Sequence, residues 1–337
     1  MNKFDEKYYI RHAMYKDIKS IMQFINDYWK KDHIMSINYN LFEYEYVNGN
    51  QVNFILAIEK ETDKIKGIFG YILASQSSDY KDIWGSMWKV ADDAMPFLGI
   101  ELAKRAVIIT NCRMHIGNGA NPNTTVPLRK IFFKEKVEKM QHFYFLNNEK
   151  QIYYIAKINN KVYRQDVTNR QSNLILFSNI EEVQDNFLVE NVNNVPFKDA
   201  WYVNKRYFLH PYYDYQVYGV EVNGKIEALI IFREVEHLNS KALRIVDYIG
   251  NHKVFGTLQS EFEYLISKYE YIDFYVFGIK QKYIEEAGFK LKDENDSNII
   301  PNYFEPFLQE NVDIWVHYLQ EGTTFFKADG DQDRPNQ

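Results

Sequence analysis

The sequence predicts an α/β (α+β) protein with two similar domains, in each of which strands and helices follow in the same order. The first observation is the length, because 337 residues suffice for two domains of roughly 100–200 residues each. The second is that the order of predicted strands and helices in the first half recurs in the second. The third is the composition, 46% hydrophobic and 26% charged, which is typical of folded globular proteins.

Composition also excludes several classes of protein. The net charge of −6 argues against a nucleic-acid binder, which normally carries a basic face. No apolar run approaches the roughly 18 residues of a membrane span, and Asp5 and Glu6 stand where a signal peptide would be apolar. The single cysteine, Cys112, excludes an intramolecular disulfide and a cysteine-based zinc site. We therefore expect a cytoplasmic protein without a metal.

The first half begins with a short strand and an amphipathic helix. Ile18, Ile21 and Ile25 share one helix face after Asp17, which predicts a helix from that residue. Two hydrophobic runs joined by three polar residues, 61–63, predict a hairpin. The expected elements are strands at 8–12, 53–60, 64–75, 82–90, 113–117 and 140–147, and helices from Asp17, at 100–109 and at 121–133.

The second half repeats this order. Asn223-Gly224 between two hydrophobic runs is the strongest turn signal in the chain and predicts a tight hairpin. Gly288 is placed to end the last predicted helix. The expected elements are strands at 173–178, 241–250 and 271–278, a hairpin over 216–235, and helices at 180–187, 254–269 and 279–289.

Aromatic residues cluster ahead of the hairpin in each half. The chain is 17% aromatic, with 27 Tyr, 24 Phe and 5 Trp, and these gather at 28–46 and 201–215 and again at 303–307. Similarity at half the chain length indicates a duplicated domain rather than an array of short repeats. The expected domains are a first at 1–150, a linker at 151–172, and a second with a C-terminal tail at 173–337. The aromatic blocks are expected to line clefts that hold a sugar.

The order of elements resembles the GCN5-related N-acetyltransferase (GNAT) superfamily, as two tandem domains over nearly the whole chain. The resemblance implies that each domain is a mixed, mostly antiparallel sheet flanked by helices. In that fold, acetyl-CoA lies in a V-shaped opening between the two central strands. The resemblance implies that the pyrophosphate rests on backbone N–H groups of the turn that opens the next helix, since a helix N-terminus attracts anions.

Two windows match the family turn, Gln/Arg-x-x-Gly-x-Gly/Ala, in part. PFLGIE (96–101) keeps Gly99 but has Glu101 where a small residue is usual, and KVFGTL (253–258) has Lys253 and Gly256. Each window is also compatible with an ordinary strand-to-helix turn. Gly99 and the asparagines of the following helix favour a donor site in the first half, whereas Lys253 favours a donor site in the second half. The implied cofactor-binding residues are Phe97, Leu98, Gly99, Ile100, Asn121, Asn123, Lys253, Phe255 and Gly256.

Four residues are candidates for acid–base chemistry, which acyl transfer requires. His33 and His210 stand in matching aromatic surroundings, and Asp93 precedes the first turn. Tyr283 occupies roughly the place of the tyrosine that often protonates the departing thiolate in the family. Each of the four could equally be a packed or surface side chain.

Other polar residues lie on predicted strands. Alternation could aim His115 or His142 into the opening, although the core is the more frequent location. Asp247 and Asp273, if they face inward, would form a buried acidic cluster with raised pKa values.

The segments 299–316 and 325–336, with the blocks YWKKDH (28–33) and RYFLHPYYDY (206–215), are similar to acyltransferase-like proteins of bacterial surface-polysaccharide (O-antigen or capsule) biosynthesis. This resemblance implies an amino sugar or nucleotide-sugar as acceptor. The tail sequence DGDQD (329–333) is expected to be solvated.

Two classes of function therefore compete. The first is an acyl-CoA-dependent, most simply acetyl-CoA-dependent, N- or O-acyltransferase that modifies a sugar or nucleotide-sugar, with no nucleic acid partner and with a homodimer as one arrangement. The second is a non-catalytic module that binds a glycan or a protein and whose CoA sites have decayed. A weaker third, a tRNA-dependent peptidyl transferase, is disfavoured by the acidic charge.

Overall fold

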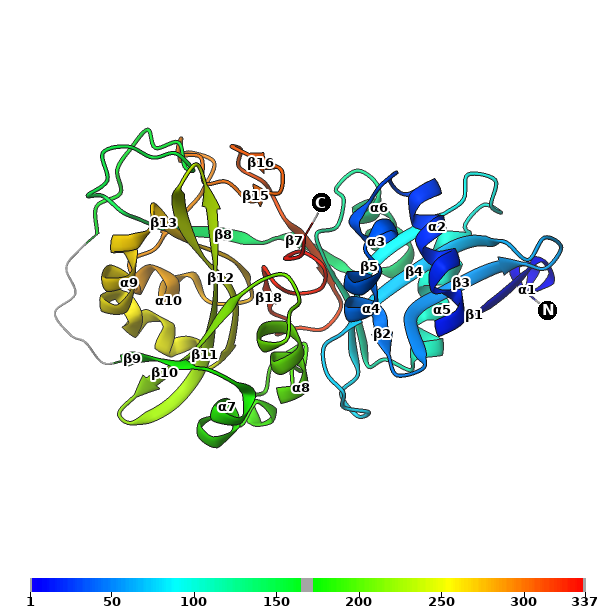
Figure 1. The fold of residues 1–337 in the computed structure, drawn as a ribbon, viewed down its shortest axis with the longest axis horizontal. Helices are drawn as coiled ribbons and strands as arrows, with labels where there is room; N and C mark the ends of the chain where they lie inside the picture. The colour runs from blue at the N-terminus through cyan, green and yellow to red at the C-terminus, as the bar shows by residue number, and fades with distance from the viewer. Residues whose placement is uncertain (1, 165–171, 336–337) are drawn as a thin grey trace. The chain divides into compact units, whose positions relative to one another are not determined.

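The computed structural model describes residues 2–164 and 172–335. Residues 165–171, which belong to the expected linker at 151–172, lie outside the described residues. The chain divides into two compact units, each with its own sheet (Figure 1). Unit 1 consists mainly of Met1–Val137 and Trp315–Gln320, and unit 2 of Glu138–Ile314 and Glu321–Arg334.

The sheet of unit 1 has the strand order β1-β3-β4-β5-β6-β17-β7, with β2 paired to β3. Strands β5 and β6 run parallel, whereas the other recorded registers are antiparallel. Its strands are β1 (Tyr8–Met14), β2 (Val47–Asn48), β3 (Gln51–Glu59), β4 (Ile65–Leu73), β5 (Asp82–Val90), β6 (Met114–Asn118), β7 (Lys136–Lys139) and β17 (Trp315–Tyr318).

Helices cover both faces of this sheet. The expected apolar stripe of α2 is buried, and it packs with α3 and α4 against the face that carries Ile68. Gly67, on the opposite face of β4, leaves room for Leu102 of α5, whose Cδ1 lies 2.7 Å from the position of a Cβ. The helices are α1 (Lys3–Lys7), η1 (Tyr15–Asp17), α2 (Ile18–Tyr28), α3 (Ile34–Ile37), α4 (Tyr39–Tyr46), α5 (Leu98–Thr110), α6 (Thr125–Leu128) and η2 (Arg129–Phe133).

The sheet of unit 2 has the order β14-β8-β13-β12-β11-β10-β9, with β18 paired to β13. Only β12 and β13 are parallel among its recorded pairs. Its strands are β8 (Gln141–Leu146), β9 (Ser172–Phe177), β10 (Tyr215–Val222), β11 (Lys225–His237), β12 (Ser240–Gly250), β13 (Tyr271–Phe277), β14 (Lys290–Leu291) and β18 (Phe325–Phe326), beside a separate ribbon of β15 (Tyr303–Phe304) and β16 (Phe307–Leu308).

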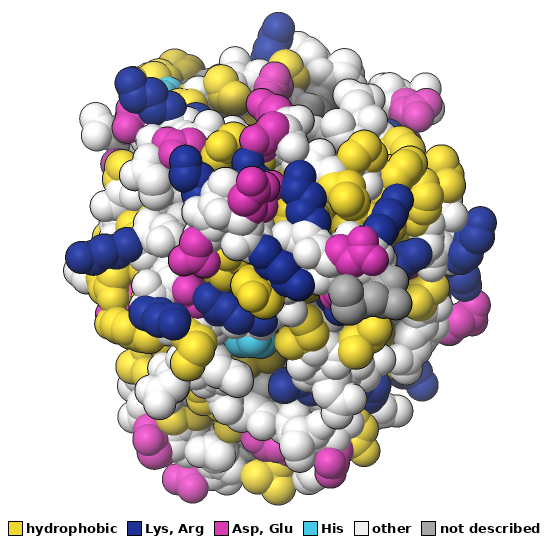
Figure 2. Space-filling model, turned by 90° about the vertical axis from the view of Figure 1, so that its right-hand side faces the viewer, with side chains coloured by type: hydrophobic (Ala, Val, Ile, Leu, Met, Phe, Trp, Pro, Cys, Tyr) yellow, Lys and Arg dark blue, Asp and Glu magenta, His cyan; other side chains and the backbone are white. Residues whose placement is uncertain are grey.

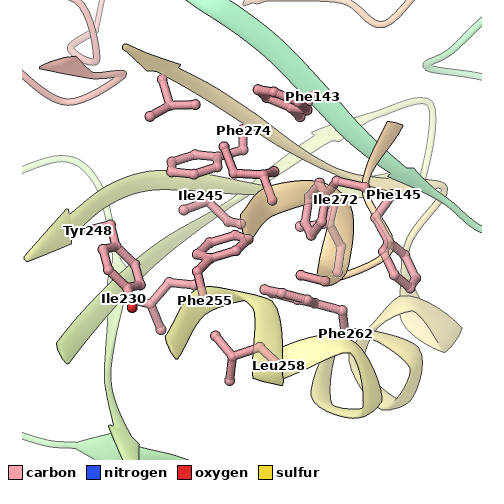
Figure 3. Close-up of a cluster of buried hydrophobic side chains, with 14 of the residues drawn as sticks. Phe143, Phe145, Ile230, Ile245, Tyr248, Phe255, Leu258, Phe262, Ile272 and Phe274 are labelled. Carbon is pink, nitrogen blue, oxygen red and sulfur yellow. The ribbon is translucent and has the colours of Figure 1, made fainter. Parts of the chain in front are cut away.

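Aromatic side chains fill the core between this sheet and its helices (Figure 3). Phe255 stacks on Phe274 with ring centroids 5.3 Å apart, and Phe262 packs edge-on against Phe289 at 4.9 Å. The helices of unit 2 are α7 (Ile180–Asn186), η3 (Val189–Asn191), α8 (Ala200–Val203), η4 (Asn204–Phe208), η5 (His252–Leu258), α9 (Gln259–Leu265), η6 (Ile266–Lys268) and α10 (Gln281–Glu286).

The two sheets have corresponding strand orders, but in each sheet one strand comes from the other half of the sequence. The strand beyond the parallel pair is β17 in unit 1, from near the C-terminus, and β8 in unit 2, from the first half. The strand expected at 140–147 therefore pairs in the second sheet, and the compact units divide at 137 instead of 150. Strand β8 is buried along nearly all its length. Such a strand suits the interior of either sheet, so its local pattern does not identify its partner.

Each parallel pair stops at a β-bulge. Strand β5 pairs with β6 only as far as Gly85 opposite Gly117, and its register with β4 shifts just after Gly85. Strand β12 pairs with β13 only as far as Ile245 opposite Phe274, and its register with β11 shifts at the following residue, Val246. A bulge bends its strand and leaves backbone groups unpaired. Each sheet therefore opens between its two central strands.

The aromatic core of unit 2 can be tested with a matched pair of substitutions on α9. Phe262 is fully buried, whereas Tyr264 is 72% exposed. We expect Phe262→Ala to lower the free energy of unfolding by about 3–5 kcal/mol, because it leaves a cavity among aromatic rings. Tyr264→Ala is expected to change it by less than about 0.5 kcal/mol. Urea denaturation followed by tryptophan fluorescence measures both, and equal effects would contradict this placement of α9.

Candidate functional site

The opening between the central strands of unit 2 is filled by the chain itself. Phe325 and Phe326 of β18 pair with the free edge of β13 at Phe277 and Val276. The N–H of Ala328 then donates to the carbonyl of Val246, at the bulge of β12, with an N···O distance of 2.8 Å. The C-terminal segment, residues 321–334, thus bridges both strands.

Buried ion pairs hold this segment in place. Lys198 Nζ lies 2.7 Å from carboxylate oxygens of both Asp247 and Asp329, and all three side chains are at most 2% exposed. Arg233 binds Asp333 through two nitrogens, at 2.8 and 2.9 Å. The expectation of a solvated acidic tail is therefore wrong. The physical reason is that Lys198 and Arg233, more than 90 residues away in sequence, offset the desolvation of these carboxylates.

The two tail carboxylates have opposite electrostatic character. Burial, opposed by Lys198 and reinforced by the charge of Asp247, raises the pKa of Asp329 to about 6. Burial also disfavours ionisation of Asp333, but Arg233, Lys327 and Arg206 outweigh it and lower the pKa of that carboxyl well below its usual range. Asp333 is therefore the firmly charged anchor.

The expected acidic cluster of Asp247 and Asp273 does not form as a pair of carboxylates. Asp273 is buried, but it accepts hydrogen bonds from two nitrogens of Arg244, each at 3.1 Å. Burial opposes ionisation, whereas Arg244 and His142 lower the pKa of Asp273. Each carboxylate thus has its own cation, because the two strand positions face different basic side chains.

A pocket of about 560 Å³ lies beside the turn after β12 in unit 2. It brings together Lys253 and Tyr283, two of the predicted site residues. The predicted neighbours Phe255 and Gly256 have other environments. The ring of Phe255 is in the core, and a Cβ at Gly256 would lie 2.8 Å from a carboxylate oxygen of Glu286, so this glycine permits close packing of η5 on α10. The lining residues are Asn191–Asn194, Glu227, Gly250–Lys253, Gly278, Lys280 and Tyr283.

The opening of unit 1 has no counterpart of β18 among the residues that the structure describes. Its turn ends at Phe97, which has a left-handed backbone (φ 68°) and is 62% exposed. Leu98 and Ile100 are buried, and the carbonyl of Gly99 accepts a 2.8 Å hydrogen bond from the indole N–H of Trp88. Of the predicted residues in this turn, Phe97 is the most accessible to a ligand.

Glu101, which stands where the family turn has a small residue, places a carboxylate at this turn. It accepts a hydrogen bond of 2.8 Å from Arg105, one helical turn along α5. Arg105 also donates to both carboxylate oxygens of Asp5, at 3.0 and 2.9 Å, so one cation is shared by two carboxylates.

The two asparagines of the next predicted helix, Asn121 and Asn123, lie in the turn that precedes α6. Asn121 Oδ1 accepts hydrogen bonds from the N–H groups of Asn123, at 2.9 Å, and Thr124, at 3.1 Å. Asn123 itself is exposed. The structure thus uses Asn121 to form a turn before α6 and leaves the side chain of Asn123 accessible.

The predicted acid–base residues His33, His210 and Asp93 lie in separate local environments. His33 Nδ1 accepts the N–H of Met35 at 3.1 Å and caps α3. Burial, with the charge of Arg206, lowers the pKa of His210 to about 3, and its Nδ1 accepts the N–H of Tyr213 at 2.9 Å. Asp93 is exposed and forms an ion pair with Lys66.

The aromatic blocks contribute to packing more than to a cleft. Phe42 and Tyr46 pack against Phe54 in the core of unit 1. In the second block, Tyr207 donates its hydroxyl proton to Asp247 and Tyr215 donates to Asp333, at 2.5 and 2.9 Å. The second block therefore supports the anchors of the C-terminal segment.

A buried polar cluster lies where β5 and β6 separate in unit 1. Arg129 Nη1 lies 3.2 Å from His115 Nδ1 and 3.6 Å from Glu135 Oε1, and His317 Nδ1 lies 2.7 Å from Glu135 Oε2. Sequence reasoning considered only His115, and only as one of two alternatives. Gly85 and Gly117 were the available signal, because glycine within a strand often marks close approach of another group. The imidazoles of His115 and His317 lie over these two glycines.

Comparisons with known proteins identify the fold. No family model matches the chain, and no curated protein matches it. A GCN5-related N-acetyltransferase from Anabaena variabilis ATCC 29413 superposes with a TM-score of 0.54 and 12% identity, over 92% of this chain and 72% of the other. A conserved protein of unknown function from Enterococcus faecalis V583, described as a probable N-acyltransferase, superposes with a TM-score of 0.52 and 10% identity over the same shares.

Saccharomyces cerevisiae N-myristoyltransferase with bound myristoyl-CoA gives a TM-score of 0.45 at 10% identity, over 95% of this chain and 82% of the other. The two superpositions above 0.5 show that the chain has the fold of the GCN5-related N-acetyltransferases. The expected α/β class, with two mostly antiparallel sheets flanked by helices, is confirmed.

On the face drawn in Figure 2, basic and acidic side chains are interspersed with hydrophobic ones. Within residues 2–164 and 172–335, no helix is both long enough and apolar enough to cross a bilayer.

The anchor at Asp333 can be tested by removing its charge. We expect Asp333→Asn to lower the free energy of unfolding at pH 7 by about 3–5 kcal/mol, because it leaves the buried Arg233 without its carboxylate. Asp331→Asn is the matched control, since the Asp331 side chain, which pairs with Arg334, is more exposed than that of Asp333. Its loss should be at most about 1 kcal/mol.

The same variants predict a pH dependence with a defined sign. The pKa of Asp333 is lowered in the folded protein, so its contribution is complete above the unfolded value of about 3.9 and declines as the pH falls further. The stability difference between wild type and Asp333→Asn should therefore narrow below about pH 4. A difference that is constant from pH 7 to pH 3 would contradict the assignment.

Proposed function

We propose that the protein is an acyl-CoA-dependent N- or O-acyltransferase whose donor site is the opening between β5 and β6 in unit 1. One observation carries the proposal. The central parallel pair of each unit separates at a bulge. Among the described residues, a further strand, β18 of the C-terminal segment, pairs at the opening of unit 2, and no strand does so at the opening of unit 1. On this view the chain consists of two tandem GNAT-like domains, of which the second is structural.

Residues of unit 1 would hold the donor in three places. The free edges of β5 and β6 beyond Gly85 and Gly117 offer backbone hydrogen bonds to the amide groups of pantetheine. The N-terminus of α5, after Phe97, offers N–H donors and a partial positive charge to the pyrophosphate. Asn123, exposed before α6, is available to polar groups of the arm.

The acceptor in this proposal is an amine or hydroxyl of a sugar or nucleotide-sugar, used in the cytoplasm for bacterial surface polysaccharide. The support is the resemblance of the segments 299–316 and 325–336 and of the blocks at 28–33 and 206–215 to acyltransferase-like proteins of surface-polysaccharide biosynthesis. The acyl group moves from the thioester sulfur to the acceptor nitrogen or oxygen, and the acceptor proton leaves with the CoA thiol. Acetyl is the simplest acyl group.

The alternative is a non-catalytic module that binds a glycan or a protein. Two observations favour it: the filled opening of unit 2, and Pro96 where the family turn has a basic or polar residue. The alternatives differ in one measurable property, because only the acyltransferase must bind acyl-CoA.

Calorimetric titration with acetyl-CoA tests the proposal directly. We expect one site per chain, because the C-terminal segment blocks the second opening. At a ligand concentration of 100 times Kd, this binding should stabilise the protein by about 2.7 kcal/mol in thermal denaturation. Absence of binding with acetyl-CoA and with longer acyl-CoA would favour the binding module.

Two charge substitutions locate the site. Phe97→Glu places a carboxylate at the start of α5, where it is compatible with the helix dipole but repels a pyrophosphate, and should weaken acetyl-CoA binding about tenfold or more. Lys253→Glu, at the corresponding turn of unit 2, is the control and should leave binding unchanged. The reverse result would assign the donor to unit 2.

A further inference from the structure

His115 lies at the vertex of the unit 1 opening. It stands on β6, two residues before the last residue paired with β5, and its ring covers Gly85, the last paired residue of β5. A Cβ at Gly85 would lie 2.6 Å from His115 Nε2. Glycine is thus needed at this position to accommodate the imidazole, and Nε2 is held at the point where the strands separate.

The neighbour of His115 determines which ring nitrogen carries the proton. Arg129 Nη1 lies 3.2 Å from His115 Nδ1. A guanidinium can only donate hydrogen bonds, so Nδ1 must be the acceptor. The neutral ring then carries its proton on Nε2, which makes that atom a donor.

This Nε2–H group has no partner among the described residues, although His115 is only 6% exposed. Leaving a buried donor unsatisfied is unfavourable, and such groups are rare in folded proteins. A donor of this kind beside an opening indicates a hydrogen bond that a ligand completes.

The rest of the buried cluster fixes His115 in this state. The guanidinium of Arg129 lies near the rings of Trp88 and Phe133, which are perpendicular to each other, with Cζ 4.7 and 4.8 Å from their centroids. Glu135 neutralises Arg129 and contacts His317. Because a guanidinium occupies its centre, the cluster does not suit a metal cation.

Burial is the main reason that the imidazole stays neutral. Burial, followed by the charges of Arg129 and His317, lowers the pKa of His115 well below its usual value, and Glu135 opposes this only in part. The donor on Nε2 is therefore unchanged across the neutral pH range.

We propose that His115 Nε2–H donates a hydrogen bond to the carbonyl oxygen of the acyl thioester and stabilises the oxyanion formed during transfer. The proposal rests on the donor site in unit 1. In the step, the acceptor's nitrogen or oxygen bonds to the acyl carbon, the carbonyl π electrons move onto oxygen, and their return breaks the C–S bond. The acceptor proton leaves on the thiol. A neutral donor placed before the reaction favours the charge that develops on oxygen.

Isotope-edited infrared spectroscopy of bound [1-¹³C]acetyl-CoA tests this hydrogen bond without knowledge of the acceptor. In the wild type, the carbonyl band should move to lower wavenumber than in water-free reference solvent. His115→Asn keeps a side-chain acceptor for Arg129 but removes the donor at the Nε2 position, and should abolish the shift. His115→Gln, whose amide reaches the Nε2 position, should retain most of it.

Affinities measured in parallel separate a role at the carbonyl from a structural role. His115→Asn should reduce the preference for acetyl-CoA over free CoA about tenfold, with the affinity for free CoA unchanged. His142→Asn, at a buried histidine of unit 2, is the control and should alter neither the band nor the affinities. Should His115→Asn not fold, His115→Leu is compared with His115→Gln in the same two measurements.

The outcomes separate this inference from the proposed function. If the wild type binds no acyl-CoA, the proposed function fails and the inference fails with it. If acetyl-CoA binds but its carbonyl band is unshifted, or the shift persists in His115→Asn, the inference is overturned while the proposed function stands. Equal losses of affinity for CoA and acetyl-CoA in folded His115→Asn would assign His115 a structural role only and also overturn it.

Discussion

The β-bulge at the end of each central parallel pair is the constraint on which the rest of the structure depends. Pairing between β12 and β13 ends at Ile245, and that between β5 and β6 ends at Gly85. Beyond each point, backbone groups of two strands lack a neighbour within their own sheet, and burying them unpaired would be unfavourable. Unit 2 meets this requirement with its own chain, through β18 and the hydrogen bond from Ala328 to Val246. In our proposal, unit 1 meets it with acyl-CoA.

Buried charge makes the closure of unit 2 durable. Desolvation of a lone carboxylate is unfavourable, but Asp333 is paired with Arg233 and Asp329 with Lys198. These ion pairs stabilise the C-terminal segment in its position between the central strands. The same physics operates in unit 1 with a different result. There Arg129 and Glu135 offset each other, and the group left without a partner is a neutral imidazole donor, not a charge. In our proposal, the same architecture thus occurs twice, with a closed opening in unit 2 and an opening suited to chemistry in unit 1.

Local patterns predicted the elements of both units well. The strand expected at 82–90 has those bounds, and the apolar stripe of α2 is buried. Asn223 and Gly224 both have positive φ, at 52° and 77°, as a tight hairpin turn between twisted strands requires. These features depend on neighbours within a few residues. The site was harder to predict from the sequence. Lys253 and Tyr283 share a pocket, but His33, His210 and Asp93 form local caps and ion pairs.

The sequence by itself determined the α/β class, the repeated order of elements and the position of most turns, because periodicity and turn chemistry are properties of short segments. Only the tertiary structure decided which sheet each exchanged strand joins, since alternation indicates the face of a strand and not its partner. It also decided that an acidic tail is buried, because Lys198 and Arg233 are distant in sequence. For the same reason the group of His115, Arg129 and His317 becomes visible only after folding, when three separate segments meet at one vertex.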